Sequence, residues 1–166
     1  MSERTLVLDH EQVQRKLRRI AHQLHEEHHT EKEIVLVGIA PRGATLAKRL
    51  ATLLEGIASL KIRLVELKLD KDHPLERPVQ VSVESKELKG RAVVLVDDVL
   101  MSGRTLMHAA SHLVQAPIKR LTTVVLVDRR HRLFPIRADI VGLTLSTTLQ
   151  EHISVEFGRK DAVHLR

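Results

Sequence analysis

The chain lacks cysteine altogether and has almost no aromatic residues. Its 166 residues include no Cys, Trp or Tyr, and the two Phe are Phe134 and Phe157. Without cysteine the chain can form no disulfide, no thiolate nucleophile and no sulfur-ligated metal site, which suits a reducing cytoplasm. An aromatic content of 1% argues against a single-strand nucleic-acid binder that stacks bases on aromatic rings.

Glycine, proline and long apolar runs are also scarce. With 7 Gly and 5 Pro the chain has little material for long disordered tracts, and its 43% hydrophobic content can fill a core. No apolar run approaches the roughly 20 residues of a membrane helix, and the N-terminal MSERTLVLDHEQ has no signal-peptide core. We therefore expect residues 1–166 to form a single domain without membrane attachment.

Positive charge is in excess. The 27 Lys and Arg outnumber the 21 Asp and Glu, which gives a formal net charge of +6. A basic protein favours anionic partners, which here could be nucleic acid, phosphorylated metabolites or an acidic protein surface.

Alternating helical and strand patterns predict an α/β fold. The segment 9–29 has an apolar helical stripe, formed by Val13, Leu17, Ile20, Ala21 and Leu24. Further helices are expected at 43–55 and 103–115, and strands at 34–39, 62–69, 79–83, 93–97, 122–127, 140–145 and 153–157. This order predicts a mostly parallel twisted sheet flanked by helices, with ligands beyond the carboxyl ends of the strands.

The stretch VVLVDDVLMSGRT, residues 93–105, carries the strongest chemical signal. Asp97 and Asp98 repel each other and are costly to bury side by side, so packing alone does not explain them. Beyond them a short loop with Gly103 opens the next helix, whose N-terminus can hold a phosphate. Carboxylates accept hydrogen bonds from a diol or hold a divalent cation, so the ligand suggested is a ribose 5-phosphate. The alternative is a plain strand-to-helix connection with an acidic cap.

This pattern resembles the 5-phosphoribosyl-1-pyrophosphate (PRPP) loop of the type I phosphoribosyltransferases. The resemblance implies their fold, with a flap hairpin and a small base-binding hood. It also implies that Asp97 and Asp98 hold the ribose hydroxyls and, indirectly, Mg²⁺. Residues Met101, Ser102, Gly103, Arg104 and Thr105 would hold the 5-phosphate, and Pro41, Arg42 and Gly43 the pyrophosphate. The polar loop 70–78 matches the mobile flap, and Arg42, Lys71 and Asp72 are the implied catalytic residues.

A longer resemblance points to one branch of these enzymes. LVGIAPRGATLAKRL at 36–50, RIAH at 19–22 and VLVDRRHRLFPIRADIVG at 125–142 are similar to the family of bifunctional pyrimidine operon attenuators and uracil phosphoribosyltransferases. The similarity runs from about Leu6 to Phe157. It implies synthesis of UMP and pyrophosphate from uracil and PRPP, binding of messenger RNA, and assembly into a homodimer or higher homo-oligomer. The implied base-binding residues are Asp128, Arg129, Val141, Gly142 and Leu143, and the implied RNA-binding residues are Arg18, Arg19, His22, His131, Arg132 and Arg137.

The chain departs from the usual pattern of that family at several positions. Pro41 replaces a Thr, Arg130 a Gly, and the run Asp-Lys-Asp-His at 70–73 a Tyr-Arg-Asp-Asp run; Leu143 and Thr144 replace Lys-Asn. Met101 stands where 6-oxopurine enzymes usually carry an Asp, which favours a pyrimidine base.

Two other functions stay open: an RNA-binding regulator that responds to pyrimidine nucleotides and has little or no activity, and a purine phosphoribosyltransferase. A metal site at His25, His28 and His29 is disfavoured, since the segment lacks the spacing of an H-E-x-x-H motif.

Overall fold

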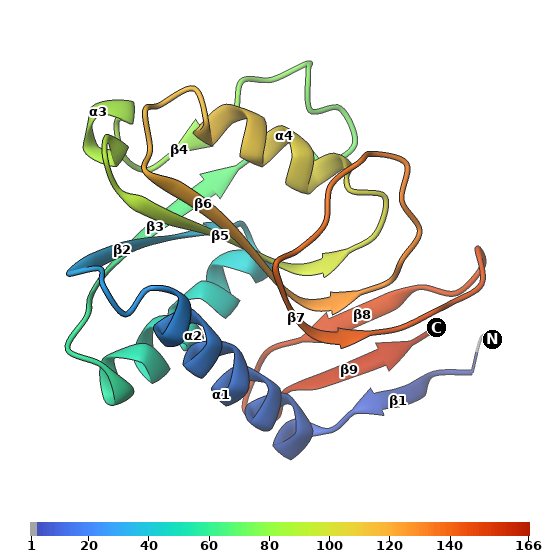
Figure 1. Cartoon of the computed structure of the whole chain (residues 1–166). Coiled ribbons are helices and arrows are strands. Elements are labelled where there is room, and N and C mark those ends of the chain that lie inside the picture. The colour runs from blue at the N-terminus through green and yellow to red at the C-terminus, as the bar shows by residue number, and fades with distance from the viewer. Residues whose placement is uncertain (1–2) are drawn as a thin grey trace.

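A computed structural model describes residues 3–166 and has a six-stranded central sheet (Figure 1). The strand order is β4-β3-β2-β5-β6-β7. The strands are β2 (Glu33–Ile39), β3 (Lys61–Lys68), β4 (Gln80–Val81), β5 (Ala92–Leu100), β6 (Arg120–Asp128) and β7 (Ile140–Thr144). All neighbours pair in parallel except β4, which runs antiparallel to β3 at the edge. The predicted mostly parallel sheet is confirmed, and so is the antiparallel pair that flanks the loop 70–78.

Helices cover both faces of this sheet (Figure 1). One face carries α1 (His10–Glu27) and α2 (Arg42–Ile57), and the other carries α4 (Arg104–Leu113) and the short α3 (Ser85–Leu88). Sequence reasoning did not predict α3. Within residues 3–166 no helix is long and apolar enough to cross a membrane.

Local sequence explains where α1 begins. The Asp9 carboxylate accepts a hydrogen bond from the Gln12 amide at 2.9 Å, and the Gln12 side chain accepts one from the Asp9 amide at 2.8 Å. Such reciprocal capping satisfies two amides that the first helical turn leaves without partners, and a cap is worth about 1 kcal/mol. Asp9 is therefore the N-cap of α1.

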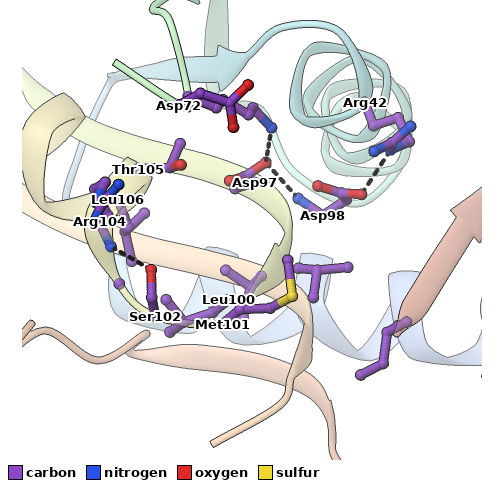
Figure 2. Close-up of a pocket in the computed structure, with 15 residues that line it drawn as sticks. Arg42, Asp72, Asp97, Asp98, Leu100, Met101, Ser102, Arg104, Thr105 and Leu106 are labelled. Carbon is purple, nitrogen blue, oxygen red and sulfur yellow. Dashed lines mark hydrogen bonds and ion pairs between the residues drawn. The ribbon is translucent and has the colours of Figure 1, made fainter. Parts of the chain in front are cut away.

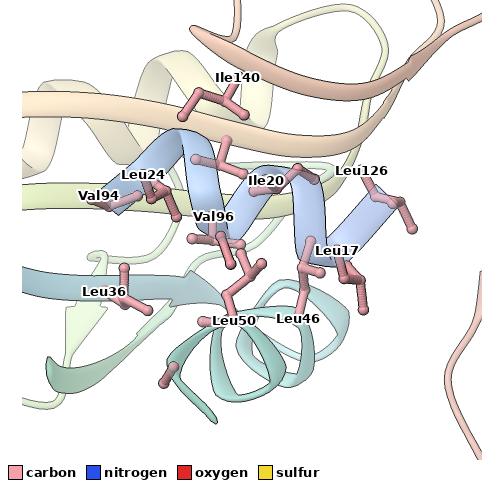
Figure 3. Close-up of a cluster of buried hydrophobic side chains, with 14 of the residues drawn as sticks. Leu17, Ile20, Leu24, Leu36, Leu46, Leu50, Val94, Val96, Leu126 and Ile140 are labelled. Carbon is pink, nitrogen blue, oxygen red and sulfur yellow. The ribbon is translucent and has the colours of Figure 1, made fainter. Parts of the chain in front are cut away.

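The predicted apolar stripe of α1 forms the centre of the larger core (Figure 3). Leu17, Ile20 and Leu24 are fully buried, and they pack with residues of α2 and the sheet, among them Leu36, Leu46, Leu50, Val94, Val96 and Leu126. Burial of one such side chain is worth roughly 1.5–3 kcal/mol. This packing holds α1 and α2 on the sheet and so places the N-terminus of α2 at the carboxyl end of β2.

A second, antiparallel sheet has the order β1-β9-β8, with β1 at Thr5–Leu8, β8 at Ile153–Glu156 and β9 at Ala162–Leu165. Sequence reasoning found only β8 of these three. The strand near the N-terminus, β1, pairs here with β9 near the C-terminus. Each of these strands has four residues, which is too short for an alternation of apolar and polar residues to be recognised in the sequence. Ile153 of β8 reaches the cavity at the end of β5, which is the place expected for a base-binding hood.

Candidate active site at the carboxyl ends of the sheet

Strand β5 loses one of its two partner strands just before the two aspartates. It pairs with β2 only as far as Val96, but it pairs with β6 as far as Leu100. The strand is thus longer than the predicted 93–97, and Asp97 and Asp98 lie within it. Because β2 ends at Ile39 and the chain continues into α2, β5 has no strand paired to this edge beside the two carboxylates.

Each carboxylate faces a cation from a different part of the chain (Figure 2). Arg42, at the start of α2, donates from Nε to Asp98 Oδ2 at 2.9 Å. Lys71 places Nζ 3.9 Å from Asp97 Oδ1. The side chains of Asp97 and Asp98 are 5% and 6% exposed, whereas those of Lys71 and Arg42 are 39% and 56% exposed. The implied pyrophosphate turn and the implied flap therefore both reach the carboxylate pair.

Gly43 makes this close approach possible. A Cβ at this position would lie 2.6 Å from the Val96 carbonyl oxygen and 3.1 Å from Asp97 Cα. Any larger residue would push the first turn of α2 away from β5. The peptide bond between Ala40 and Pro41, just before this turn, is cis.

Asp97 is the residue whose charge is most perturbed. Burial and, to a smaller extent, the neighbouring Asp98 charge raise the pKa of Asp97 from its ordinary 3.8 to about 8, whereas Lys71 opposes the shift. Desolvation and a like charge both disfavour the ionised carboxylate. Strongly shifted groups in a cleft are typical of functional sites.

The loop 101–105, called here the phosphate loop, lies across the cavity from the aspartates (Figure 2). Gly103 adopts a φ of +88°, a conformation that favours glycine, and α4 begins at Arg104. The Ser102 hydroxyl accepts a hydrogen bond from the Arg104 amide at 3.2 Å. A helix N-terminus of this kind presents amides and a positive dipole end to an anion.

These elements enclose one cavity of about 330 Å³ (Figure 2). Its lining includes Arg42, Lys71, Asp72, Asp97 and Asp98 together with residues 99–106, Val125 and Ile153. The structure therefore brings together the implied pyrophosphate, flap, ribose and phosphate residues, with the exception of Pro41 and Gly43, which do not line the cavity. The cavity is large enough for a small phosphorylated ligand.

Comparison with known proteins identifies the family. A family model described as the phosphoribosyl transferase domain matches residues 4–161. The chain belongs to the phosphoribosyltransferase family. It is 38% identical over 165 residues to the bifunctional protein PyrR of Haemophilus ducreyi, covering 95% of this chain and 92% of the relative. It is 40% identical to the PyrR protein of Streptomyces coelicolor, with 93% and 84% covered.

Solved structures of phosphoribosyltransferases share the fold. A hypoxanthine-guanine phosphoribosyltransferase from Bacillus anthracis superposes with a TM-score of 0.71 at 21% identity, covering 86% of this chain and 82% of that one. The hypoxanthine phosphoribosyltransferase of Trypanosoma cruzi gives a TM-score of 0.73 at 17% identity, with 85% and 81% covered. The expected type I phosphoribosyltransferase fold is confirmed, and so is the resemblance to the attenuator branch. The protein is a phosphoribosyltransferase, whose reaction uses PRPP.

The implied base-binding residues lie in different surroundings. Asp128 Oδ1 accepts hydrogen bonds from the Arg130 amide and from Arg132. The carbonyl oxygens of Val141 and Gly142 accept hydrogen bonds from Arg19 Nη2 at 2.9 and 2.7 Å. An arginine of α1 therefore already occupies the two backbone acceptors of β7 that would read a base. Leu143 is half-buried beside the larger core.

Buried Arg129 donates to Met101 Sδ, Thr147 Oγ1 and the Thr148 carbonyl. None of these five residues lines the 330 Å³ cavity. A base-reading role for them remains a prediction.

The implied RNA-binding residues also divide into two groups. Arg18 and His22 are exposed on α1, and Arg137 is exposed before β7. In contrast, His131 Nε2 lies 2.5 Å from the Thr147 carbonyl oxygen, and the guanidinium of Arg132 donates to three acceptors within the protein. Arg19 is occupied with β7, as described above.

Sequence reasoning missed five apolar residues of the cavity wall, namely Val99, Leu100, Leu106, Val125 and Ile153. Val99 comes from β5 and Ile153 from β8, and both lie with Met101 around the same space. The position of Val99 directly after the aspartates could have suggested it. Ile153 could not be found in this way, since its sheet forms from the two ends of the chain.

Proposed function

We propose that the protein transfers ribose 5-phosphate from PRPP to uracil, giving UMP and pyrophosphate. The observation that carries this proposal is one cavity in which two carboxylates stand between Arg42 and the phosphate loop. This order matches the order of groups in PRPP, where the ribose diol lies between pyrophosphate and 5-phosphate. We also propose that the protein works in the cytoplasm as a homo-oligomer.

Catalysis in this proposal rests on positioning and charge. The base displaces pyrophosphate in line at the anomeric carbon, so positive charge develops on the sugar and negative charge on the leaving group. Arg42 and Lys71 would bind the leaving group, while Asp97 and Asp98 hold the ribose hydroxyls. Fixed charges that are already in place lower the barrier, because no solvent needs to reorganise. The 70–78 loop would exclude water from the reacting carbon.

Magnesium fits the carboxylate pair. Mg²⁺ prefers oxygen ligands, and Asp97 and Asp98 supply carboxylate oxygens at the open edge of β5. In the part of the chain from residue 3 to 166, no group of three or more His, Asp or Glu side chains could hold a metal ion. We propose that the ion enters with PRPP and is held chiefly by the ligand's own oxygens, with Asp97 and Asp98 holding it indirectly. Bound there, it would neutralise pyrophosphate charge.

The side chains near the phosphate loop favour a pyrimidine. Met101 can neither donate nor accept a proton for a purine ring nitrogen. Val99, Met101 and Ile153 together give the cavity an apolar wall against which a flat ring can pack. We therefore propose uracil over hypoxanthine or guanine, with the purine enzyme as the competing case.

A panel of bases tests the proposal. Uracil, orotate, hypoxanthine, guanine, adenine and xanthine are each incubated with PRPP and Mg²⁺, and pyrophosphate release is followed. Uracil should give the highest kcat/KM. A preference for a purine would overturn the choice of base, and pyrophosphate release with none of the six would favour the regulator.

RNA-linked regulation is the second proposed function. The relatives are named bifunctional, and the exposed face of α1 carries Arg15, Arg18 and His22. Filter binding should compare a structured RNA loop with a scrambled one, with and without UMP, over a range of salt. About four phosphate contacts predict a slope near −3 for log affinity against log salt. Arg18→Ala should weaken binding, while Arg159→Ala, an exposed control at the other end of the chain, should not.

A further inference from the structure

Arg132 joins three separate segments beside the phosphate loop. Its Nε donates to the Ile136 carbonyl at 2.8 Å, its Nη1 to the Met101 carbonyl at 2.8 Å, and its Nη2 to Asp128 Oδ1 at 2.7 Å. The side chain is 25% exposed. The guanidinium is thus directed inward at three acceptors, one of them in the phosphate loop.

Neighbouring amides extend this contact along the loop. The Arg129 amide donates to the Leu100 carbonyl at 2.9 Å, and the amides of Leu133 and Phe134 donate to the Ser102 carbonyl at 2.8 and 3.0 Å. The segment 129–134 therefore holds three successive carbonyls, those of residues 100, 101 and 102. Of the three, only the Met101 carbonyl is held by a side chain.

Gly103 shows how closely the two segments pack. A Cβ on Gly103 would lie 2.8 Å from Ile136 Cγ2 and 3.1 Å from the Phe134 carbonyl oxygen. The guanidinium of Arg104 also lies over the Phe134 ring, 5.7 Å from its centroid. The segment 129–136 thus forms the back wall of the phosphate loop.

Because peptide bonds are planar and trans, the contacts to the carbonyls of residues 101 and 102 also fix the directions of the N–H groups of Ser102 and Gly103. In such a bond the C=O of one residue and the N–H of the next point in opposite directions. When Arg132 holds the Met101 carbonyl, the Ser102 N–H must point away from Arg132. The Leu133 and Phe134 amides fix the Gly103 N–H in the same way. Ser102 and Gly103 both line the cavity, where amides of this kind can bind a phosphate.

We propose that Arg132 is a positioning residue for the 5-phosphate: it holds the Met101 carbonyl and thereby aims the Ser102 amide at the phosphate. This inference rests on the proposed binding of PRPP in the cavity. It assigns Arg132 an internal role, distinct from the RNA contact that the resemblance implied.

Two ligands that each carry one end of PRPP test the idea by calorimetric titration. Ribose 5-phosphate reports on the phosphate loop, and pyrophosphate with Mg²⁺ reports on the Arg42 end. The variant Arg132→Met keeps the side-chain length but removes all donors. Arg159→Met is the control, because Arg159 is an exposed arginine that does not line the cavity.

Arg132→Met should weaken ribose 5-phosphate binding about tenfold, the size of effect expected when one charge-assisted hydrogen bond is lost. Its affinity for pyrophosphate should stay within about twofold of that of the parent, a difference well under the tenfold that corresponds to one such bond. Arg159→Met should match the parent for both ligands. Equal ribose 5-phosphate affinity in parent and Arg132→Met would overturn the inference. Equal weakening of both ligands would also overturn it, because a general loss of structure predicts that result.

Two further outcomes have a clear meaning. If the parent binds neither ligand, the proposed function itself fails and the inference falls with it. If Arg132→Met does not fold, Arg132→Lys replaces it: the single ammonium keeps the charge but cannot reach all three acceptors. The same selective loss of ribose 5-phosphate is then expected, and unchanged affinity for it would overturn the inference.

Discussion

Asp97→Asn should make the protein more stable above neutral pH. The Asp97 carboxylate is buried against Asp98, and burial raises its pKa to about 8 from the ordinary 3.8. Asn keeps the shape of the side chain and its Oδ1, which accepts a hydrogen bond from the Asp98 amide at 2.9 Å. The substitution therefore removes the charge with little change in packing.

The pKa gives the sign and the size of the effect. Between about pH 4 and pH 8 the folded protein keeps a proton on Asp97 that the unfolded chain has lost, so the free energy of unfolding falls as pH rises. Each pH unit in this range is worth about 1.36 kcal/mol. From pH 5 to pH 8 the free energy of unfolding of the parent should therefore fall by on the order of 3–4 kcal/mol through this group. The Asp97→Asn variant should not show this decrease.

Urea unfolding at pH values from 5 to 8.5 measures this directly. The quantity of interest is the difference between parent and variant, because the 11 histidines titrate in both proteins. Asp72→Asn is the matched control: it removes the same charge from an exposed side chain that lines the same cavity. Curves for the parent and Asp97→Asn that stay parallel over this range would refute the reasoning. Affinity for PRPP should fall in the same variant.

Four other outcomes are expected. Arg130 has a φ of +65°, so Arg130→Gly should raise the free energy of unfolding by about 1 kcal/mol, whereas Arg130→Ala, which keeps the strain, should not. Gly103→Ala should lower it by about 1–3 kcal/mol in the same urea assay, because of its φ of +88° and the contact with the back wall. Met101→Asp should lower kcat/KM for uracil relative to hypoxanthine in a competition assay, and an unchanged ratio would mean that position 101 does not contact the base. Hydrogen exchange in the 70–78 loop should slow when PRPP and Mg²⁺ are added, and equal protection would contradict its role as a flap.

The central sheet and the helices α1, α2 and α4 were predictable because their signals are local. The stripe of α1 and the cap at Asp9 both lie within one stretch of chain, and packing and capping agree there. The buried strands β2, β5 and β6 appear in the sequence as short apolar runs for the same reason. Predicted limits differ from the observed ones by a few residues, chiefly at β5, which continues through the aspartates while β6 still pairs with it.

The second sheet could not be predicted because its pairing is not local. Thr5 pairs with Leu165, a contact between the two ends of the chain that no short pattern reveals. The same limit applies to the site. The phosphate loop was predicted as one contiguous stretch, whereas Ile153 enters the cavity only through that sheet. The occupation of the Val141 and Gly142 carbonyls by Arg19 likewise depends on how α1 packs against β7.

The geometry explains how the chain tolerates two adjacent buried carboxylates before any ligand binds. Arg42, in the first turn of α2, pairs with the Asp98 carboxylate, and Lys71, in the 70–78 loop, lies beside Asp97, which keeps its proton up to about pH 8. Both cations are partly exposed and can turn toward an incoming ligand, whereas the aspartates are buried within β5. The hydroxyls and the ion of that ligand would then take the place of the cations, because a buried carboxylate left without a partner is costly. The carboxylates therefore keep a fixed position in the site, whereas the side chains of Arg42 and Lys71 can move. Such movement suits the proposed role of both cations, which is to bind the pyrophosphate as it leaves.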